Sequence, residues 1–564
     1  MPSRARRYEP NPIYPVADDQ VRRGWAAASQ LAPHDGVLAV DGPMVADWAA
    51  LVEGLRVHRR ISAVIDMRDA FSPWEQVRKR TAPHERLRGD PDFATIPSIR
   101  LADLFDELPV PDSAGGRLTV VYGPGAALVD HDVLWYADLP KRYAEAAVSC
   151  GAGRNLGASS AEPASTRRLF YIDWPLLDRH RDALADRIDL WLDLQDPTKP
   201  AMLTGREVRA TLGRLAHAPF RTRPTFNTTS WGGHWGQREL GLNTDGPNTA
   251  VGYELIAPES GILLGSDLRH AVEVPFQLAV ALNPEQLLGT DVHQRFGASF
   301  PIRFDYLDTV GGGSLSVHCH PRPDYMRSVF GWQYPQHETY YVMVGSPGNV
   351  VFLGLRDNVD LDEFQLRAHQ AEQAGKPFDV FDYVQQHPAI EHQLFLIPAG
   401  TPHGSGKDNV VLEISATPYL YSLRFYDWLR RDARGQQRPV HVDHAFDNLD
   451  TRRAGPRVRS ELIPQPRPLA TGSGWREDLI GSLPTMFFDI HRLEITGGAT
   501  AHQHTHGRFH VLNVVAGDAV VVHTREGQHP LHFAETIVVP AAVADYRLEA
   551  LGDDPVRVVK AFVA

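Results

Sequence analysis

The sequence predicts a multidomain protein, with an N-terminal α/β domain followed by two β-barrel domains of the jelly-roll type, the first of which carries a helical insertion. A chain of 564 residues is too long for one hydrophobic core. The first part alternates short apolar runs with helix-like stretches, and the rest has short β-rich segments broken by Gly, Pro and Asn. We therefore expect domains at residues 1–217, 218–450 and 475–564, with residues 451–474 as a linker.

Four apolar runs of the first domain are expected to be parallel strands, because continuous apolar stretches fit strands that are buried on both faces. They are residues 37–42, 62–67, 118–123 and 188–194. The helix-like stretches between them predict the crossover helices that a parallel sheet requires.

The first of these strands meets its helix through residues 41–48, where a P-loop would place its phosphate cradle. Asp47 and Trp48 stand in the region of the Gly-Lys pair of that motif, so an NTP kinase is not indicated. The domain is interpreted as degenerate and kinase-like, and a scaffold or oligomerisation domain is the alternative.

Two later segments depart from the barrel pattern. Residues 361–386 are charged and helix-prone, which predicts a helix inserted between strands. Residues 451–474 are rich in Pro, Arg and Gly, which favours an extended linker before the C-terminal barrel.

Charge and cysteine content exclude some classes of partner and indicate the cellular compartment. The formal net charge is -12 and no long basic block occurs, so neither nucleic acid nor an anionic membrane surface is expected as a partner. Cys150 and Cys319 are the only cysteines and lie far apart, which indicates neither a disulfide framework nor a cysteine-ligated zinc. No stretch of 18 apolar residues occurs, so a cytoplasmic protein is expected.

The strongest chemical signal is a set of four metal-ligand candidates: His318, His320, Glu338 and His403. Residues two apart on a strand point to the same face, so His318 and His320 can both aim into a barrel. Imidazole and carboxylate ligands converging from three strands suit one divalent metal. Zinc is the first choice, and Mn, Fe and Ni are alternatives.

Longer motifs around these ligands resemble the class I mannose-6-phosphate isomerases of the cupin superfamily. The resemblance rests on RFGASFPIRFDYLDTVGGGSLSVHCHP (residues 295–321), PAGTPH (398–403) and LEISATPYLYSLRFYDWLRRDARGQQRP (412–439). It covers roughly residues 224–450 and, weakly, the C-terminal barrel. It implies two cupin barrels, preceded here by an extra α/β domain.

The resemblance implies a metal-dependent enzyme that interconverts an aldose and a ketose, such as mannose 6-phosphate and fructose 6-phosphate or a related sugar. A small sugar or sugar phosphate is then the partner, and the oligomeric state is open. The family's active-site arginine maps to Arg424, which would stabilise developing negative charge beside the metal. A structural salt bridge from Arg424 to Asp427 or Glu413 is the alternative.

Three departures from the family pattern weaken the catalytic assignment. The family's metal-binding glutamine is His318 here, and its two lysines are Gln336 and Asp305, which do not preserve the positive charge. Lys407 could substitute, although a lysine in a Gly-rich loop is usually solvated. His337, Glu413 and Asp305 are further acid/base candidates, and spacing does not choose among them.

The C-terminal barrel offers a candidate second metal site at His504, His506 and His510, which match the spacing of a cupin motif. Asp545 rather than histidine stands near the position of the final ligand, so a solvated histidine loop is the alternative. For the whole protein two other functions stay open. One is a cupin metalloenzyme with oxygenase or epimerase chemistry, and the other is a non-catalytic sugar-sensing protein.

Overall fold

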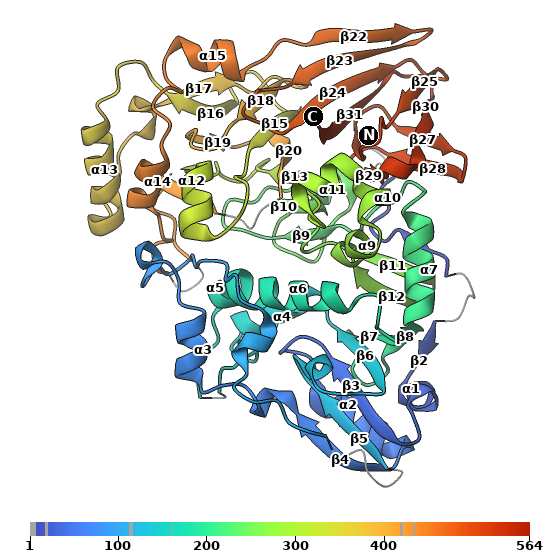
Figure 1. Cartoon of the computed structure of the whole chain (residues 1–564). Coiled ribbons are helices and arrows are strands. Elements are labelled where there is room, and N and C mark those ends of the chain that lie inside the picture. The colour runs from blue at the N-terminus through green and yellow to red at the C-terminus, as the bar shows by residue number, and fades with distance from the viewer. Residues whose placement is uncertain (1–6, 17–20, 112–116, 160, 418–420, 433–434) are drawn as a thin grey trace.

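The computed structural model describes residues 7–16, 21–111, 117–159, 161–417, 421–432 and 435–564. The N-terminal α/β part lies at one end of the molecule, and the β-rich remainder of the chain is stacked on it (Figure 1). The protein is therefore multidomain and mostly β, with several sheets.

The α/β part is built on a seven-stranded sheet of order β2-β8-β7-β6-β3-β5-β4. Its strands are β2 (Arg22–Arg23), β3 (Gly36–Asp41), β4 (Ile61–Asp66), β5 (Leu118–Tyr122), β6 (Val133–Asp138), β7 (Leu190–Asp193) and β8 (Ala201–Thr204). Neighbouring strands in the run β7-β6-β3-β5-β4 pair in parallel. The four predicted strands correspond to β3, β4, β5 and β7 and are confirmed. The helices are α1 (Trp25–Leu31), α2 (Trp48–His58), α3 (Trp74–Arg80), α4 (Lys141–Ser149), α5 (Thr166–Arg168), α6 (Trp174–Leu184) and α7 (Gly205–Leu215).

The turn between β3 and α2 is organised by the buried carboxylate of Asp41. This side chain accepts hydrogen bonds from the backbone N–H groups of Gly42 (2.8 Å), Ala127 (2.8 Å) and Gly125 (3.3 Å). It also pairs with Nε2 of His180 at 2.8 Å. The carboxylate thus ties the start of the β3–α2 turn, through Gly42, to the loop that follows β5, through Gly125 and Ala127.

The middle part forms two facing antiparallel sheets. One has the order β18-β15-β20-β13-β10-β9 and the other β17-β16-β19-β14-β21. The strands of the first are β9 (Thr225–Asn227), β10 (Val251–Leu255), β13 (Ile302–Asp308), β15 (Glu338–Val344), β18 (Leu394–Ile397) and β20 (Val410–Ala416). Those of the second are β14 (Val317–Cys319), β16 (Val350–Leu355), β17 (Val384–Pro388), β19 (His403–Ser405) and β21 (Leu423–Tyr426).

Several helices lie between the strands of this barrel, and one of them falls in the insertion predicted at residues 361–386. Residues of the charged segment form α13 (Leu361–Ala374), which the Asp360 side chain caps by accepting from the N–H of Glu363. The other helices are α8 (Trp235–Leu240), α9 (Phe276–Leu282), α10 (Pro284–Leu288), α11 (Thr290–Phe296), α12 (Pro323–Tyr325) and α14 (Val442–Asn448).

The C-terminal part is a second pair of antiparallel sheets, of orders β22-β23-β24-β31-β26-β29 and β25-β30-β27-β28. The first sheet contains β22 (Arg467–Gly472), β23 (Trp475–Gly481), β24 (Phe488–Ile495), β26 (His510–Ala516), β29 (Thr536–Val539) and β31 (Val556–Val563). The second contains β25 (Thr500–His504), β27 (Ala519–Thr524), β28 (Gly527–His532) and β30 (Asp545–Leu551).

Two segments differ from the expected organisation. Residues 451–474 are not extended throughout, because they contain α15 (Pro456–Leu462) and the edge strand β22, which pairs with β23. Near the start of the chain, β1 (Ile13–Tyr14) leaves the α/β part and pairs in parallel with β11 (Gly261–Asp267), which itself pairs with β12 (His270–Pro275). The β1–β11 pairing joins segments distant in sequence, and composition alone carries no signal for it.

Both cysteines are free, Cys150 exposed and Cys319 buried. Within the described ranges, every helix is too short or too polar to cross a membrane.

Replacing Asp41 by alanine is expected to destabilise the α/β part by about 3–5 kcal/mol, the usual cost of removing one partner from a buried ion pair. Asp47→Ala is a matched control in the same turn. The Asp47 side chain caps α2 by accepting from the N–H of Ala50 at 2.9 Å, and its loss should cost about 1 kcal/mol. Hydrogen exchange of the sheet amides in urea would measure both losses. Equal losses would contradict the role given to Asp41.

Candidate metal centre

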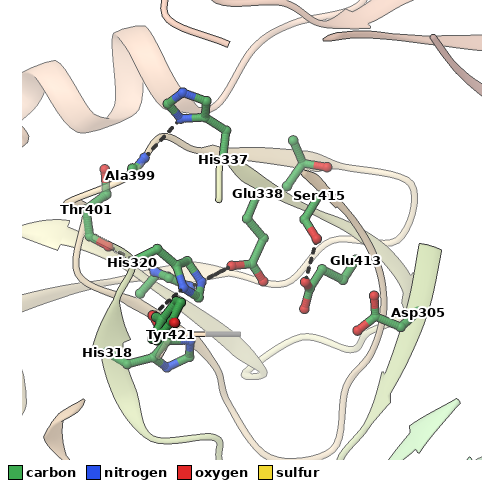
Figure 2. A network of polar contacts seen from close by, with 12 residues as sticks. Asp305, His318, His320, His337, Glu338, Ala399, Thr401, Glu413, Ser415 and Tyr421 are labelled. Atoms are coloured by element: carbon green, nitrogen blue, oxygen red, sulfur yellow. Dashed lines mark hydrogen bonds and ion pairs between the residues drawn. The ribbon is translucent and has the colours of Figure 1, made fainter. Parts of the chain in front are cut away.

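Four side chains from three strands converge inside the middle barrel. His318 lies on β14, His320 follows that strand, and Glu338 and His403 open β15 and β19. Their ligand atoms all lie within 4.8 Å of one another, and all four residues are buried. Figure 2 shows His318, His320 and Glu338 facing a common space. The four candidates predicted from spacing are therefore brought together.

The alternation of β14 explains how one short segment supplies two of these ligands. Successive side chains of a strand point to opposite faces. The Cys319 thiol, between the two histidines, donates to the carbonyl of Ala445 on α14 at 3.7 Å. His318 and His320 point the other way, into the barrel.

Each histidine is oriented by a backbone carbonyl, which accepts a hydrogen bond from its Nδ1–H. The accepting oxygens belong to Ser316 (3.0 Å), Tyr421 (3.2 Å) and Thr401 (2.9 Å), for His318, His320 and His403 respectively. A proton fixed on Nδ1 leaves Nε2 as the free ligand atom, and metal-binding histidines usually have this arrangement.

The carboxylate of Glu338 closes the cluster. Its Oε2 lies 2.6 Å from Nε2 of His320 and 3.0 Å from Nε2 of His403. Burial raises the pKa of Glu338, but its interactions and hydrogen bonds with His403 and His320 outweigh that effect and hold the pKa well below its usual value. Burial, followed by the neighbouring His403 and His320, lowers the pKa of His318 well below its usual value.

These protonation states fit a cation. Burial also lowers the pKa of His320, although Glu338 opposes that shift. An ionised carboxylate and neutral imidazoles are the forms that bind a metal ion. With Nδ1–H of His320 directed at a carbonyl, its short Nε2–Oε2 contact with Glu338 needs a proton on one of the two atoms or a cation bound to both. Protonation of His320 is disfavoured by its lowered pKa, and protonation of Glu338 by the lowered pKa of that carboxyl group.

The cluster faces a cavity of about 250 Å³ whose wall also carries Arg303, Asp305 and Glu413. Nη2 of Arg303 donates to Oε1 of Glu413 at 2.6 Å and to Oδ2 of Asp305 at 3.4 Å. Asp305 on β13 is paired directly with Glu413 on β20. Sequence reasoning missed Arg303, although its spacing of two from Asp305 on one strand could have placed both on the same face.

The two carboxyl groups beside Arg303 hold protons more tightly than exposed acids. Burial raises the pKa of Asp305 to about 7, against the attraction of Arg303 and with a further contribution from Glu338. Burial, Asp305 and Glu338 raise the pKa of Glu413 well above its usual value. A carboxyl group that titrates near neutral pH in a cavity suits general acid–base chemistry.

Two other predicted acid/base candidates lie outside this cavity. Nδ1 of His337 accepts from the N–H of Ala399 at 3.2 Å, and Figure 2 shows its ring directed away from the cluster. Lys407 is exposed, its N–H donates to Oγ of Ser314, and it is not among the described residues that line the cavity. Neither residue is positioned to act beside the metal ligands.

Arg424 on β21 lines the same cavity, and its backbone pairs with that of His318. Its Nη1 donates to the carbonyl of Pro439 at 3.0 Å and to Oδ2 of Asp92 at 3.4 Å. The acidic partner is therefore neither Asp427 nor Glu413, the two suggested by the sequence. Asp92 belongs to the N-terminal part, 332 residues away along the chain.

The histidines of the C-terminal barrel do not form a comparable group. His504, His506 and His510 line a cavity of about 1100 Å³. Among the described residues, the ligand atoms of His318, His320, Glu338 and His403 converge closely enough to hold one metal ion. The three C-terminal histidines form no such group. Nδ1 of His510 is bonded to the Tyr546 hydroxyl at 2.8 Å, and Nδ1 of His504 accepts from the N–H of His506.

Comparisons with known proteins place relatives along the chain. Residues 24–217 match a family described as "Domain of unknown function (DUF8485)". The chain is 24% identical over 324 residues to the mannose-6-phosphate isomerase of Streptococcus mutans, covering 57% of this chain and 91% of that protein. It is 21% identical over 342 residues to mannose-6-phosphate isomerase ManA of Bacillus subtilis, covering 59% and 97%. A crystal structure of the Bacillus subtilis mannose 6-phosphate isomerase matches with a TM-score of 0.48 and 17% identity, over 61% of this chain and 99% of that one.

His403→Ala is expected to abolish stable metal binding. Loss of an outer-shell partner of a metal ligand already costs about 10–100-fold in affinity, so loss of a ligand should cost more than about 100-fold. Elemental analysis after dialysis would measure metal per chain. His387→Ala is the matched control, because this buried histidine bonds the carbonyl of Leu353 at 3.3 Å and is outside the cluster. Retention of metal by a folded His403→Ala protein would refute the assignment.

Proposed function

We propose that the protein is a metal-dependent aldose–ketose isomerase, with mannose 6-phosphate and fructose 6-phosphate or a related sugar as its substrate pair. The observation that carries the proposal is the His–Glu cluster opening into a cavity with buried carboxyl groups. The low-identity relation to mannose-6-phosphate isomerases supports a sugar isomerase-like function independently.

The proposed ligands of one divalent metal are His318, His320, Glu338 and His403. Three imidazoles and one carboxylate suit zinc, and also Mn, Fe or Ni. A bound divalent metal would polarise the carbonyl and hydroxyl oxygens of a sugar. The protein supplies three Nε2 atoms, whose rings are fixed by backbone carbonyls, and a buried carboxylate. These ligand atoms are therefore already in place for a metal ion.

The protein groups then have to move one proton between two neighbouring carbons. Asp305 is proposed as the base that removes this proton, because its pKa of about 7 leaves it partly ionised at neutral pH. Glu413, with its raised pKa, is the neutral partner that can return a proton to an oxygen or carbon of the intermediate. Arg303 and Arg424 are the cations that can stabilise the negative charge of an enediolate.

The donor set also supports a second candidate. With histidine at position 318 where the isomerase family has glutamine, the cluster has the three-His, one-Glu composition found in other metal-binding barrels, and it could hold iron or manganese for oxygenase or epimerase chemistry. Lys407 lies outside the cavity lining, so no lysine replaces the two that the family uses.

Metal-loaded protein is expected to exchange the transferred hydrogen with solvent. Fructose 6-phosphate, mannose 6-phosphate and the free sugars would be incubated in D₂O and followed by proton NMR, with His403→Ala as the inactive control. Bound metal without exchange on any of these sugars would contradict the isomerase and favour the second candidate.

The rate of isomerisation is expected to rise as the pH rises through about 7, because Asp305 must lose its proton to act as a base. Its pKa is raised, so activity should be lost as pH falls below that value rather than near pH 4. Asp305→Asn should lower kcat by about 100-fold or more. Glu413→Gln is the comparison variant, because Glu413 is the neighbouring carboxyl group and is not the proposed base. An acidic limb that is unchanged in Asp305→Asn would assign the base elsewhere.

A further inference from the structure

A segment of the N-terminal part is fastened to the rim of the metal-binding barrel. Oγ1 of Thr95 donates to the carbonyl of Val329 at 2.8 Å, and the N–H of Ile96 donates to that of Phe330 at 2.9 Å. The Tyr421 hydroxyl donates back to the carbonyl of Ala94 at 3.0 Å. These bonds tie one stretch of the N-terminal part to the barrel by its backbone.

Aromatic packing secures the same segment. The ring of Phe93 lies 4.3 Å from the imidazole of His441, 5.5 Å from the ring of Tyr421 and 5.8 Å from that of Phe330, measured between centroids. Phe93 is 5% exposed. Figure 1 shows the N-terminal part in blue reaching the barrel near α14, where Arg86 pairs with Asp447. Asp92, next to Phe93, is therefore held against the barrel by its neighbours in the chain.

Asp92 presents its carboxylate to an arginine and a histidine of the barrel wall. Its Oδ2 lies 3.4 Å from Nη1 of Arg424 and 3.1 Å from Nε2 of His441. Burial raises the pKa of Asp92, but the hydrogen bond from His441 and the charges of His441 and Arg424 bring it below the usual value. The group is therefore a fixed negative charge beside the arginine proposed to meet the substrate.

The other arginines of the cavity wall also have acidic partners. Nη1 of Arg438 lies 3.1 Å from Oδ2 of Asp427, and Nε of Arg303 lies 3.4 Å from Oδ1 of Asp305. Within the described cavity lining, each arginine thus faces an acidic partner, and no lysine is present. A phosphate dianion would have to displace a carboxylate from one of these arginines, and like charges close together cost several kcal/mol.

We propose that Asp92 is a positioning residue contributed by the N-terminal part, and that it makes the metal site selective for an uncharged sugar over its phosphate ester. This inference rests on the proposed function for its identification of sugars as ligands. By engaging Nη1, Asp92 orients Arg424 and satisfies its charge. The cavity then offers carboxylates and an already neutralised guanidinium, which accept from and donate to sugar hydroxyl groups.

The test compares binding and turnover of mannose and mannose 6-phosphate by the full-length, metal-loaded protein. Ligand-detected NMR titration gives each dissociation constant, and the isomerisation assay gives kcat and KM separately. Wild type is expected to bind mannose at least about tenfold more tightly than mannose 6-phosphate. Preference for the phosphate ester in wild type would overturn the inference without any variant.

Three variants distinguish the effect of the negative charge of Asp92 from a general disturbance of the fold. Asp92→Asn should gain about tenfold in affinity for mannose 6-phosphate and raise KM for mannose, whereas Asp92→Glu should restore the wild-type preference. Asp106→Asn is the matched control, because this carboxylate pairs with Arg80 at 2.6 Å within the N-terminal part, and it should leave the preference unchanged. Circular dichroism and melting temperature verify folding.

Failure of the inference and failure of the proposed function give different results. An unchanged preference in folded Asp92→Asn would overturn the role of Asp92 even if sugars are isomerised. A preference for uncharged sugar that Asp92→Asn reverses, without isomerisation of any sugar, would support the inference and remove the proposed reaction.

Discussion

The contact of the Glu338 carboxylate with the imidazoles of His320 and His403 is the constraint around which the middle barrel is organised. A buried carboxylate is costly unless it is paired and hydrogen-bonded. Here the ligands stand at or next to the ends of three strands, and backbone carbonyls fix the ring nitrogens of the histidines. The sheets therefore have to meet in one register for the cluster to exist, and its four ligand atoms could hold a metal ion.

Around this cluster the cavity wall carries both arginines and buried carboxyl groups. Arg303 lies between Asp305 and Glu413, and burial pushes the pKa values of both acids upward. The same burial that makes the ion pairs expensive thus creates groups able to exchange protons near neutral pH. The positions that carry lysines in the isomerase family contribute no positive charge here, so electrostatic stabilisation would fall to arginines that already have acidic partners.

The N-terminal part reaches this site through a buried apolar core that is continuous with that of the barrel. In its sheet, the buried carboxylate of Asp41 joins the β3–α2 turn to the loop that follows β5. Its segment around Phe93 packs on the barrel, and Asp92 reaches Arg424. The α/β part therefore contacts the wall of the candidate metal centre through packing and charge, a link that its fold alone does not suggest.

The sequence by itself determined the local structure and the four candidate metal ligands. Apolar runs gave the parallel strands, the charged segment gave α13, and the spacing of His318 and His320 placed both on one face, because these patterns depend on residues close together in the chain. Only the tertiary structure decided which acid meets Arg424, that Arg303 joins Asp305 and Glu413, that β1 pairs with β11, and that the C-terminal histidines do not converge. These outcomes depend on how distant segments pack and on how burial shifts charge, and neither is encoded in any local pattern of residues.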